Sequence, residues 1–415
     1  MNQQSFLRSL FDEAVRVADP MICVPAHLPP KPDGKLLVIG AGKASARMGE
    51  ALESVWGPCE GLIITRYGYE RPLQGVTLKS ASHPVPDEAG LRATRELRAL
   101  LNQANKDTFI LALISGGGSS LMIEPAGDMT LEDKMAVNAA LLTSGAPIDE
   151  MNVVRKHLSR IKGGQLAAAA YPATLHTLMI SDVPGDDPAY IASGPTVGDS
   201  STPADAQAII KRYGIDVPAS AEAVLNDATG VITPGDERLS TTTNTIIAAP
   251  SQSLEAAKAI AEKEGVNVTI LGDALEGEAR DLAREQGALV LKMQSGISKP
   301  HLLLSGGECT VTRTGDGIGG PNAEYALSLA IALDGAPGIH ALACDTDGVD
   351  GAAEVAGAMV APETLARARA KGIDPQASLT NNDAHSFFAS LEDQVSSGPT
   401  LTNVNDFRAI LIEPT

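Results

Sequence analysis

Apolar and polar residues follow one another along this chain in short blocks, and the blocks predict strands that alternate with helices. In the first half, short apolar runs of strand length are followed by amphipathic stretches with helical spacing. The predicted strands lie at 35–39, 62–65, 76–80, 108–114 and 174–180, and the predicted helices at 43–55, 88–102, 131–144 and 148–170. This alternation is typical of a parallel, twisted sheet with helices on both faces.

A second alternating stretch begins near residue 246. It predicts helices at 254–264, 276–285 and 322–333, and strands at 266–271 and 339–344. Within 300–313 the apolar residues continue through Gly306, Gly307 and Glu308 with period two, which predicts a hairpin and therefore a mixed sheet. The segment 196–236 is rich in Asp, Thr, Pro and Gly, so we expect it to pass between domains.

The length of 415 residues also favours two domains. We therefore expect an α/β protein. Residues 1–235 are predicted to form a Rossmann-like domain with a doubly wound parallel sheet, and residues 236–415 a second α/β domain with a mixed sheet.

Turns rich in glycine or acids close several of the apolar runs. These runs with their turns lie at 36–42, 109–120, 177–185, 301–308 and 340–348. Such turns expose backbone N–H groups, hydroxyls or carboxylates at the carboxyl ends of strands. Because those ends meet at one edge of a parallel sheet, the pattern predicts a site for a charged ligand.

The first two turns favour a phosphate ligand. Gly40 and Gly42 allow close approach of the backbone, and Lys43 adds a cation where a helix begins; a tight structural turn is the open alternative. The second turn has three consecutive glycines between hydroxyls, which predicts an anion-binding nest formed by Ser115, Gly116, Gly117, Gly118, Ser119 and Ser120.

Two common nucleotide motifs are disfavoured. The first turn is shorter than a Walker A loop, which argues against an ordinary P-loop ATPase. The next strand ends at Thr65 and Arg66 without the acid that holds the ribose of NAD, and Arg66 leaves NADP as a weaker option.

The formal net charge of −19 disfavours non-specific binding to nucleic acid or to anionic membranes. In so acidic a chain, clustered cations are informative. The densest cluster comprises Arg155, Lys156, Arg160 and Lys162, and it predicts a clamp for a carboxylate or phosphate, with a solvated helix face as the alternative.

Aspartates cluster in the turns SDVPGDD and DTDGVD. They suit Mg²⁺ or a general base, and simple turn capping is the alternative. An EF-hand is excluded because the glycine of the second turn falls too early. Of the seven histidines, His83 and His157 are expected to face a site.

The remaining composition points to an ordinary intracellular protein. The four cysteines are isolated, so neither a zinc site nor a disulfide framework is indicated. No apolar run reaches the length of a membrane span, and residues 1–20 predict an amphipathic helix rather than a signal peptide. We expect a cytoplasmic location.

These motifs, in this order, resemble the glycerate 2-kinases whose C-terminal part is called the MOFRL domain. The match runs through nearly the whole chain. The matching segments are VIGAGKAS (38–45), SHPVPDEAG (82–90), SGGGSSLM (115–122), NVVRKHLSRIKGGQLA (152–167), SDVPGDDPAYIASGPT (181–196), LSGGECTVT (304–312), GGPNAEYALSLA (319–330) and DTDGVDG (345–351).

The resemblance implies ATP-dependent phosphorylation of D-glycerate at the 2-hydroxyl, with Mg²⁺, in a cleft between the two domains. ATP and D-glycerate are then the expected partners, and a homodimer is one expected assembly. We assign Lys43, Arg155 and Asp182 to catalysis, with Arg155 on the glycerate carboxylate. The expected metal ligands are Asp182, Asp187, Asp345 and Asp347. The expected substrate and nucleotide contacts are Gly40, Gly42, Ser115, Gly116, Gly117, Gly118, Ser119, Ser120, Lys156, Gly306, Gly307, Glu308, Asn322 and Glu324.

One position departs from the family pattern. Pro321 stands where many members have arginine, so an arginine contact does not transfer, although Asn322 and Glu324 match. Two other functions stay open: an NAD(P)H-dependent hydroxypyruvate reductase, a label that the family has often carried, and a nucleotide sensor without catalysis.

Overall fold

A computed structural model describes residues 2–351 and 353–414, and the chain divides into two compact units. The parallel-sheet unit comprises Pro20–Ser181 and Asp186–Ile247. The mixed-sheet unit comprises the chain up to Asp19, the short piece Asp182–Gly185, and the chain from Ala248 onward. The predicted α/β class, with a parallel sheet and a separate mixed sheet, is confirmed. Among the described residues, no helix is both long enough and apolar enough to cross a bilayer.

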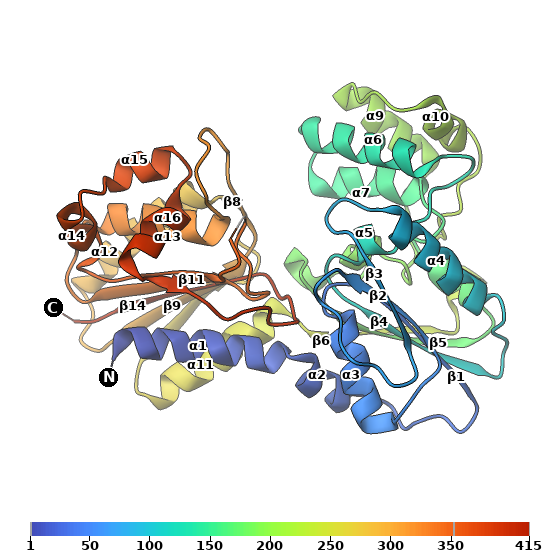
Figure 1. Cartoon of the computed structure of the whole chain (residues 1–415), viewed down its shortest axis with the longest axis horizontal. Helices are drawn as coiled ribbons and strands as arrows, with labels where there is room; N and C mark the ends of the chain where they lie inside the picture. The colour runs from blue at the N-terminus through green and yellow to red at the C-terminus, as the bar shows by residue number, and fades with distance from the viewer. Residues whose placement is uncertain (1, 352, 415) are drawn as a thin grey trace. The chain divides into compact units, whose positions relative to one another are not determined.

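The parallel-sheet unit is built on a six-stranded sheet (Figure 1). Its strands are β1 (Lys35–Ala41), β2 (Gly61–Arg66), β3 (Thr77–Ala81), β4 (Thr108–Ile114), β5 (Thr174–Ile180) and β6 (Thr242–Ala248). Its helices are α2 (Pro20–His27), α3 (Ser45–Trp56), α4 (Glu88–Leu101), α5 (Gly118–Leu121), α6 (Leu131–Thr143), α7 (Ile148–His157), α8 (Gln165–Ala170), α9 (Pro203–Tyr213), α10 (Ala219–Leu225), and the short turns η2 (Ile191–Ser193) and η3 (Glu237–Leu239).

The strand order β3-β2-β1-β4-β5-β6 is that of dinucleotide-binding Rossmann sheets. Strands β1 to β5 pair in parallel, and the near-continuous apolar runs of β1 and β4 match a sheet that is buried on both faces. Right-handed crossovers place α3 and α4 on opposite faces (Figure 1). The order reverses between β1 and β4, so the ligand crevice is expected beside the turns that follow these two strands.

Four helices of this unit form a separate apolar cluster. Helices α6, α7, α9 and α10 pack around buried residues that include Val137, Leu141, Val154 and Ile209. The segment 196–236, expected to pass between domains, instead contributes α9 and α10 to this cluster. That expectation is wrong because the polar composition belongs to the caps and outer faces of these helices, whereas their inner faces are apolar.

Helix α6 begins with a capping box. The Thr130 hydroxyl accepts the Asp133 N–H at 3.1 Å, and the Asp133 carboxylate accepts the Thr130 N–H at 3.1 Å. We expect Thr130→Ala to lower the free energy of unfolding by about 1 kcal/mol, measured by urea denaturation, because one N–H of the first turn loses its acceptor. Thr130→Ser retains the hydroxyl and is the control. Equal urea midpoints for the alanine and serine variants would contradict the assigned role of the cap.

The mixed-sheet unit has three layers. Its sheet has the order β13-β12-β11-β14-β9-β7, and its neighbours are antiparallel except for β7 and β9. The strands are β7 (Asn267–Gly272), β9 (His301–Gly307), β11 (Ile339–Asp345), β12 (Gly357–Val360), β13 (Gln394–Val395) and β14 (Asp406–Ile412), with β8 (Gly277–Glu278) and β10 (Cys309–Thr310) in a small separate sheet. The helices are α1 (Gln3–Ala18), α11 (Pro250–Lys263), α12 (Ala279–Gln294), α13 (Pro321–Leu333), α14 (Thr364–Ala370), α15 (Pro375–Thr380) and α16 (Ala384–Leu391), and the turn η1 (Pro184–Asp186) lies where the chain passes between the units.

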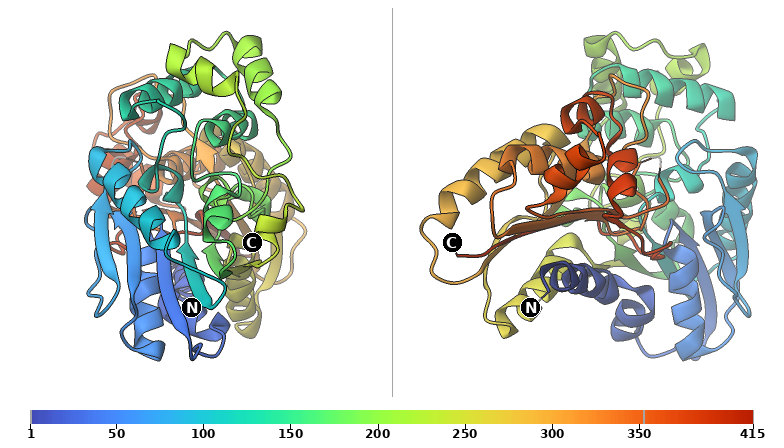
Figure 2. Two further views of the ribbon diagram at one scale, coloured as in Figure 1. Left: turned by 90° about the vertical axis from the view of Figure 1, so that its right-hand side faces the viewer. Right: turned by 60° about the vertical axis from the view of Figure 1, so that its left-hand side comes forward.

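Alternate residues of the sheet face opposite layers. Leu302 and Leu304 of β9 pack with α1 and α11, whereas Leu303 packs with α12 and α13 on the other face. Figure 2 (right) shows the dark blue α1 and the yellow α11 on one side of this sheet and the orange and red helices on the other. Apolar residues of both layers therefore cover both faces.

Two details differ from the sequence-based expectations. The predicted hairpin through Gly306–Glu308 is wrong, because β9 pairs with β14 and β7 while β10 pairs with β8. The units also divide near residue 247 rather than at 235/236, and α1 belongs to the mixed-sheet unit because its apolar face packs on α11 and β14. The alternation of apolar and polar residues predicts where strands lie and which faces are buried, but it does not predict which strands pair with one another.

Candidate active site

The turn after β1 is held against the turn after β4 at the point where the strand order reverses. The Lys43 N–H donates to the Gly116 carbonyl at 2.8 Å, and the Ala44 N–H donates to the Ser115 hydroxyl at 3.0 Å. Gly42 has φ 147°, and a Cβ there would lie 2.0 Å from Ser115 Oγ. The glycine is therefore required by this close approach, and Ser115 positions the turn that carries Lys43.

The SGGGSS turn leaves space where two side chains converge. Gly117 is left-handed (φ 79°) and precedes α5. A Cβ at Gly117 would lie 2.9 Å from His83 Cδ2 and 3.1 Å from Lys43 Cγ. Gly117 thus brings the predicted Lys43 and His83 beside the predicted nest, and a larger residue would displace both side chains.

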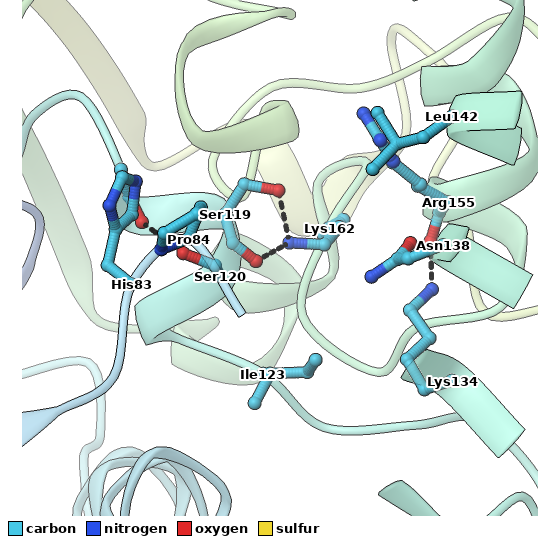
Figure 3. Close-up of a pocket in the computed structure, with 11 residues that line it drawn as sticks. His83, Pro84, Ser119, Ser120, Ile123, Lys134, Asn138, Leu142, Arg155 and Lys162 are labelled. Atoms are coloured by element: carbon cyan, nitrogen blue, oxygen red, sulfur yellow. Dashed lines mark hydrogen bonds between the residues drawn. The ribbon is translucent and has the colours of Figure 1, made fainter. Parts of the chain in front are cut away.

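A cavity of about 260 Å³ opens beside this turn (Figure 3). Helix α6 contributes Lys134, Asn138 and Leu142, which are spaced four residues apart and so share one face. The other lining residues are His83, Pro84, Gly117, Ser119, Ser120, Ile123, Arg155 and Lys162. The described residues that line the cavity include cations but no Asp or Glu, so its chemistry favours an anionic ligand.

Two lysines of this cavity are almost fully buried. Lys162 Nζ donates to the Ser119 carbonyl at 2.6 Å and to its hydroxyl at 2.9 Å (Figure 3). Lys134 Nζ donates to the carbonyls of Arg155 at 3.0 Å and Leu158 at 3.2 Å, which lie at the C-terminal end of α7. These contacts fix both amines at the cavity wall.

Burial dominates the electrostatics of this group. It lowers the pKa of Lys134 to about 7, with a further contribution from the charge of Arg155. Burial likewise lowers the pKa of Lys162 well below its ordinary value, aided by the charges of Lys134 and Arg155. The Arg155 guanidinium, whose Nη1 donates to Asn152 Oδ1 at 3.4 Å, also has its pKa lowered by burial.

The other predicted cation of this segment lies elsewhere. Lys156 is buried, forms an ion pair with Asp199 at 2.5 Å, and lies 5.1 Å from the ring centroid of Tyr190. It does not line the cavity, because residues 155 and 156 project in different directions around α7. His157 is buried too, with its ring nitrogens 2.6 Å from Thr229 Oγ1 and 3.1 Å from Ser201 Oγ, and it does not line the cavity.

Several predicted contacts of the mixed-sheet unit have structural partners. The Asp350 carboxylate accepts the N–H groups of Asn322 at 2.9 Å and Ala323 at 2.8 Å, and it thereby caps α13. Glu324 is fully buried and pairs with Arg280 at 2.5 Å. Pro321 occupies the first position of α13, where proline is favoured. The start of α13 is therefore closed by a carboxylate rather than open to phosphate.

The turn after β9 is likewise tied to its own unit. The carbonyls of Gly306 and Gly307 each accept a hydrogen bond of 3.2 Å from Arg408. A Cβ at Gly307 would lie 2.2 Å from the backbone nitrogen of Leu275, so the glycine answers a packing requirement. Glu308 follows with an exposed side chain.

The predicted metal ligands lie at the end of β11 and in the connecting segments. Asp345 accepts the Asp347 N–H at 2.8 Å, and Asp347 accepts the Val349 N–H at 2.9 Å. Asp182 accepts from the Asn403 amide at 3.2 Å, and the exposed Asp187 accepts the Ala189 N–H at 2.9 Å. Among the residues that the structure describes, no three His, Cys, Asp or Glu side chains are grouped to hold a metal ion.

The cavity contains two polar residues that the predicted site omitted, Lys134 and Asn138, and one that was noted only within the basic cluster, Lys162. A signal for Lys134 exists: it lies on the apolar face of α6 with Leu131, Val137 and Leu141, where a lysine needs a buried partner or a ligand. Asn138 Oδ1 is buried and has no hydrogen-bond partner among the described residues.

Known proteins match this chain over almost its whole length. Residues 6–226 match the family described as "Domain of unknown function (DUF4147)", and residues 301–406 match the MOFRL family. A protein of Agrobacterium vitis named "Putative hydroxypyruvate reductase" is 52% identical, over 99% of this chain and 95% of its own. The D-glycerate 2-kinase of Thermotoga maritima is 38% identical, over 90% of this chain and 89% of its own.

The fold matches as well. A crystal structure of glycerate kinase from Thermotoga maritima superposes with a TM-score of 0.89 at 35% identity, covering 99% of both chains.

Proposed function

This chain belongs to the glycerate kinase family whose members carry a MOFRL region, and on that premise we propose that it transfers phosphate from ATP to the 2-hydroxyl of D-glycerate. The products are 2-phosphoglycerate and ADP. One observation of the structure carries the proposal: a cavity lined by cations and, among the described residues, by no Asp or Glu, beside the SGGGSS turn at the topological switch point of a Rossmann-like sheet.

Phosphoryl transfer depends on positioning and on charge stabilisation more than on covalent chemistry. Lys43 lies on a turn whose backbone is fixed by Gly116 and Ser115, beside the space left by Gly117. We assign its ammonium group to the phosphoryl group in transfer, and the SGGGSS turn to the phosphate chain of ATP. Because the backbone of the turn that carries Lys43 is already fixed, the turn does not need to reorganise when the ligand binds.

Arg155 is assigned to the glycerate carboxylate. Its guanidinium lines the cavity, and among the described residues its hydrogen bond to Asn152 Oδ1 is long, at 3.4 Å, so donors remain for a bidentate contact. Asp182 is assigned to accept the proton of the 2-hydroxyl. These roles require that glycerate lies with its carboxylate toward Arg155.

The reaction implies Mg²⁺, which such enzymes hold by one or two carboxylates together with phosphate oxygens and water, so a group of three protein ligands is not required. One or two of the predicted ligands Asp182, Asp187, Asp345 and Asp347 would hold it. Bound Mg²⁺ would neutralise charge on the phosphate oxygens.

The reductase is the second candidate, favoured by the name of the Agrobacterium vitis relative. A dehydrogenase with this strand order holds the ribose of NAD through an acid at the end of β2. Here β2 ends at Thr65 and Arg66, and the Arg66 guanidinium lies 5.2 Å from the ring centroid of Tyr69. The end of β2 therefore argues against a reductase that uses NAD.

An assay with matched substrates separates the candidates. The purified protein is given D-glycerate with ATP and Mg²⁺, and separately hydroxypyruvate with NADH or NADPH. We expect ADP to form only when D-glycerate is present. NAD(P)H oxidation at a comparable rate without ADP would establish the reductase, and ATP binding without turnover would establish the sensor.

A further inference from the structure

The two buried lysines of the cavity lack a counter-charge. Lys134 is 1% exposed and Lys162 is 2% exposed, yet their hydrogen bonds go to carbonyl and hydroxyl oxygens. Among the described residues, neither lysine belongs to an ion pair. A buried ammonium group without an anion is costly, and hydrogen bonds to neutral oxygens offset only part of that cost. The arrangement is therefore incomplete until an anion enters.

The titratable side chains that line the cavity with this pair are all basic. Arg155 comes from α7, Lys162 from the segment that follows α7, and Lys134 from α6, while His83 lines the opposite wall from the segment before α4 (Figure 3). No carboxylate lines the cavity among the described residues, whereas the chain as a whole carries a net charge of −19. Basic side chains are thus concentrated in this cavity, although the chain as a whole is strongly acidic.

Asn138 adds a recognition group for the substrate. Its amide oxygen is buried in the same wall without a hydrogen-bond partner. The 3-hydroxyl of a bound glycerate can donate to this amide oxygen, which leaves the proton of the 2-hydroxyl for Asp182. The cavity therefore fits a small hydroxycarboxylate, with the carboxylate on the cations and a hydroxyl on Asn138.

We propose that the substrate carboxylate enters this cavity together with a proton, which Lys134 and Lys162 take up as the anion binds. This deepens the proposed function and rests on it for the identity of the substrate. The proton comes from solvent and forms an N–H bond on a lysine amine. No covalent bond to the substrate is made.

The direction of the pH dependence follows from linkage. With the pKa of Lys134 near 7 and that of Lys162 also well lowered, the empty cavity carries fewer protons above neutral pH than the occupied one, since a bound anion raises both pKa values. The Kd for the anion therefore rises as pH increases above about 7, by up to about tenfold per pH unit for each proton taken up. Below that pH the dependence flattens, because the amines are already protonated.

Isothermal titration calorimetry measures this uptake directly. D-Glycerate is titrated into the full chain at about pH 7.5 in two buffers of different ionisation enthalpy, with and without a non-hydrolysable ATP analogue. We expect the binding enthalpy to differ between the two buffers. The difference, divided by the difference in the ionisation enthalpies of the buffers, should correspond to an uptake of about half a proton or more per glycerate bound. The Kd measured at about pH 8.5 should be several-fold weaker than at about pH 7.

Three variants test the assignment. Lys134→Met and Lys162→Met should each reduce the proton uptake, whereas a merely structural lysine would leave it unchanged. Lys106→Met, which removes an exposed lysine of the same unit, is the matched control and should behave like the wild type. If both lysine variants misfold, the buffer dependence of the unmodified protein still decides the proposal.

The outcomes separate this proposal from the proposed function. Binding of D-glycerate with heats independent of buffer overturns the proton uptake and leaves the kinase intact. If D-glycerate gives no heat, the two other small 2-hydroxycarboxylates glycolate and lactate are titrated. Their carboxylates are fully ionised in this pH range, so any proton uptake comes from the protein. If either compound binds with proton uptake, the result would support the proposed role of the cavity and contradict D-glycerate as the substrate. No binding of any of the three, with or without the ATP analogue, overturns the proposal.

Discussion

Replacing Lys43 by alanine is expected to lower kcat for phosphoryl transfer by about 10²- to 10³-fold, the usual cost of removing one contact that stabilises charge in a transition state. The side chain lies beside Gly117 on a turn whose backbone hydrogen bonds do not involve it. The fold should therefore survive, and the measurement is steady-state ADP production with saturating D-glycerate and ATP.

Lys35→Ala is the matched control for this experiment. Lys35 begins the same strand, β1, at the opposite end, where its amine donates to the Gln103 carbonyl at 3.2 Å on the surface. Its loss should leave kcat unchanged. A Lys43→Ala enzyme with wild-type kcat would assign the turn after β1 to structure alone.

Replacing Arg155 by methionine is expected to raise the KM for D-glycerate by about 10- to 100-fold, which corresponds to the loss of one hydrogen-bonded charge pair. A contact to the carboxylate is made in the ground state and the transition state alike, so kcat should change much less than KM. Methionine keeps most of the buried volume. The measurement is a full saturation curve in D-glycerate at fixed ATP.

Arg160→Met is the control for this variant. Arg160 lies five residues further on in the same basic segment, is exposed, and donates to the Gly127 carbonyl at 3.0 Å outside the cavity. Its KM should match the wild type. A reduced kcat with an unchanged KM in Arg155→Met would move Arg155 from the carboxylate to the reacting phosphate.

Much of the fold could be predicted because its signals are local. The apolar runs of β1 and β4, and the glycines that follow them, report buried parallel strands and tight turns. What could not be predicted is pairing between distant segments. The run from β9 into β10 has the alternation of a hairpin, yet β9 pairs with β14, which lies about a hundred residues further on.

The candidate site divides in the same way. The turns at Lys43 and Gly117 were predicted from the chemistry of glycine after a strand, and the structure places them together. Lys134 was missed because its sequence neighbours describe an ordinary helix. Its burial depends on α7, whose carbonyls it reaches, and that contact is tertiary.

Acidic and amide residues near glycine turns are the least predictable. Glu324 and Asn322 match the family pattern, yet Arg280 and Asp406 occupy their side chains within the mixed-sheet unit. A single sequence does not distinguish a residue that stabilises the fold from a residue that contacts a ligand. Only the partners in the structure distinguish them.

Product identification by NMR tests the central claim most directly. The purified protein is incubated with D-glycerate, ATP and Mg²⁺, and the phosphorus and proton spectra of the mixture are recorded. We expect 2-phosphoglycerate and ADP to appear in equal amounts, and only with both substrates present. Formation of 3-phosphoglycerate, or no phosphoryl transfer while hydroxypyruvate is reduced by NAD(P)H, would contradict the account.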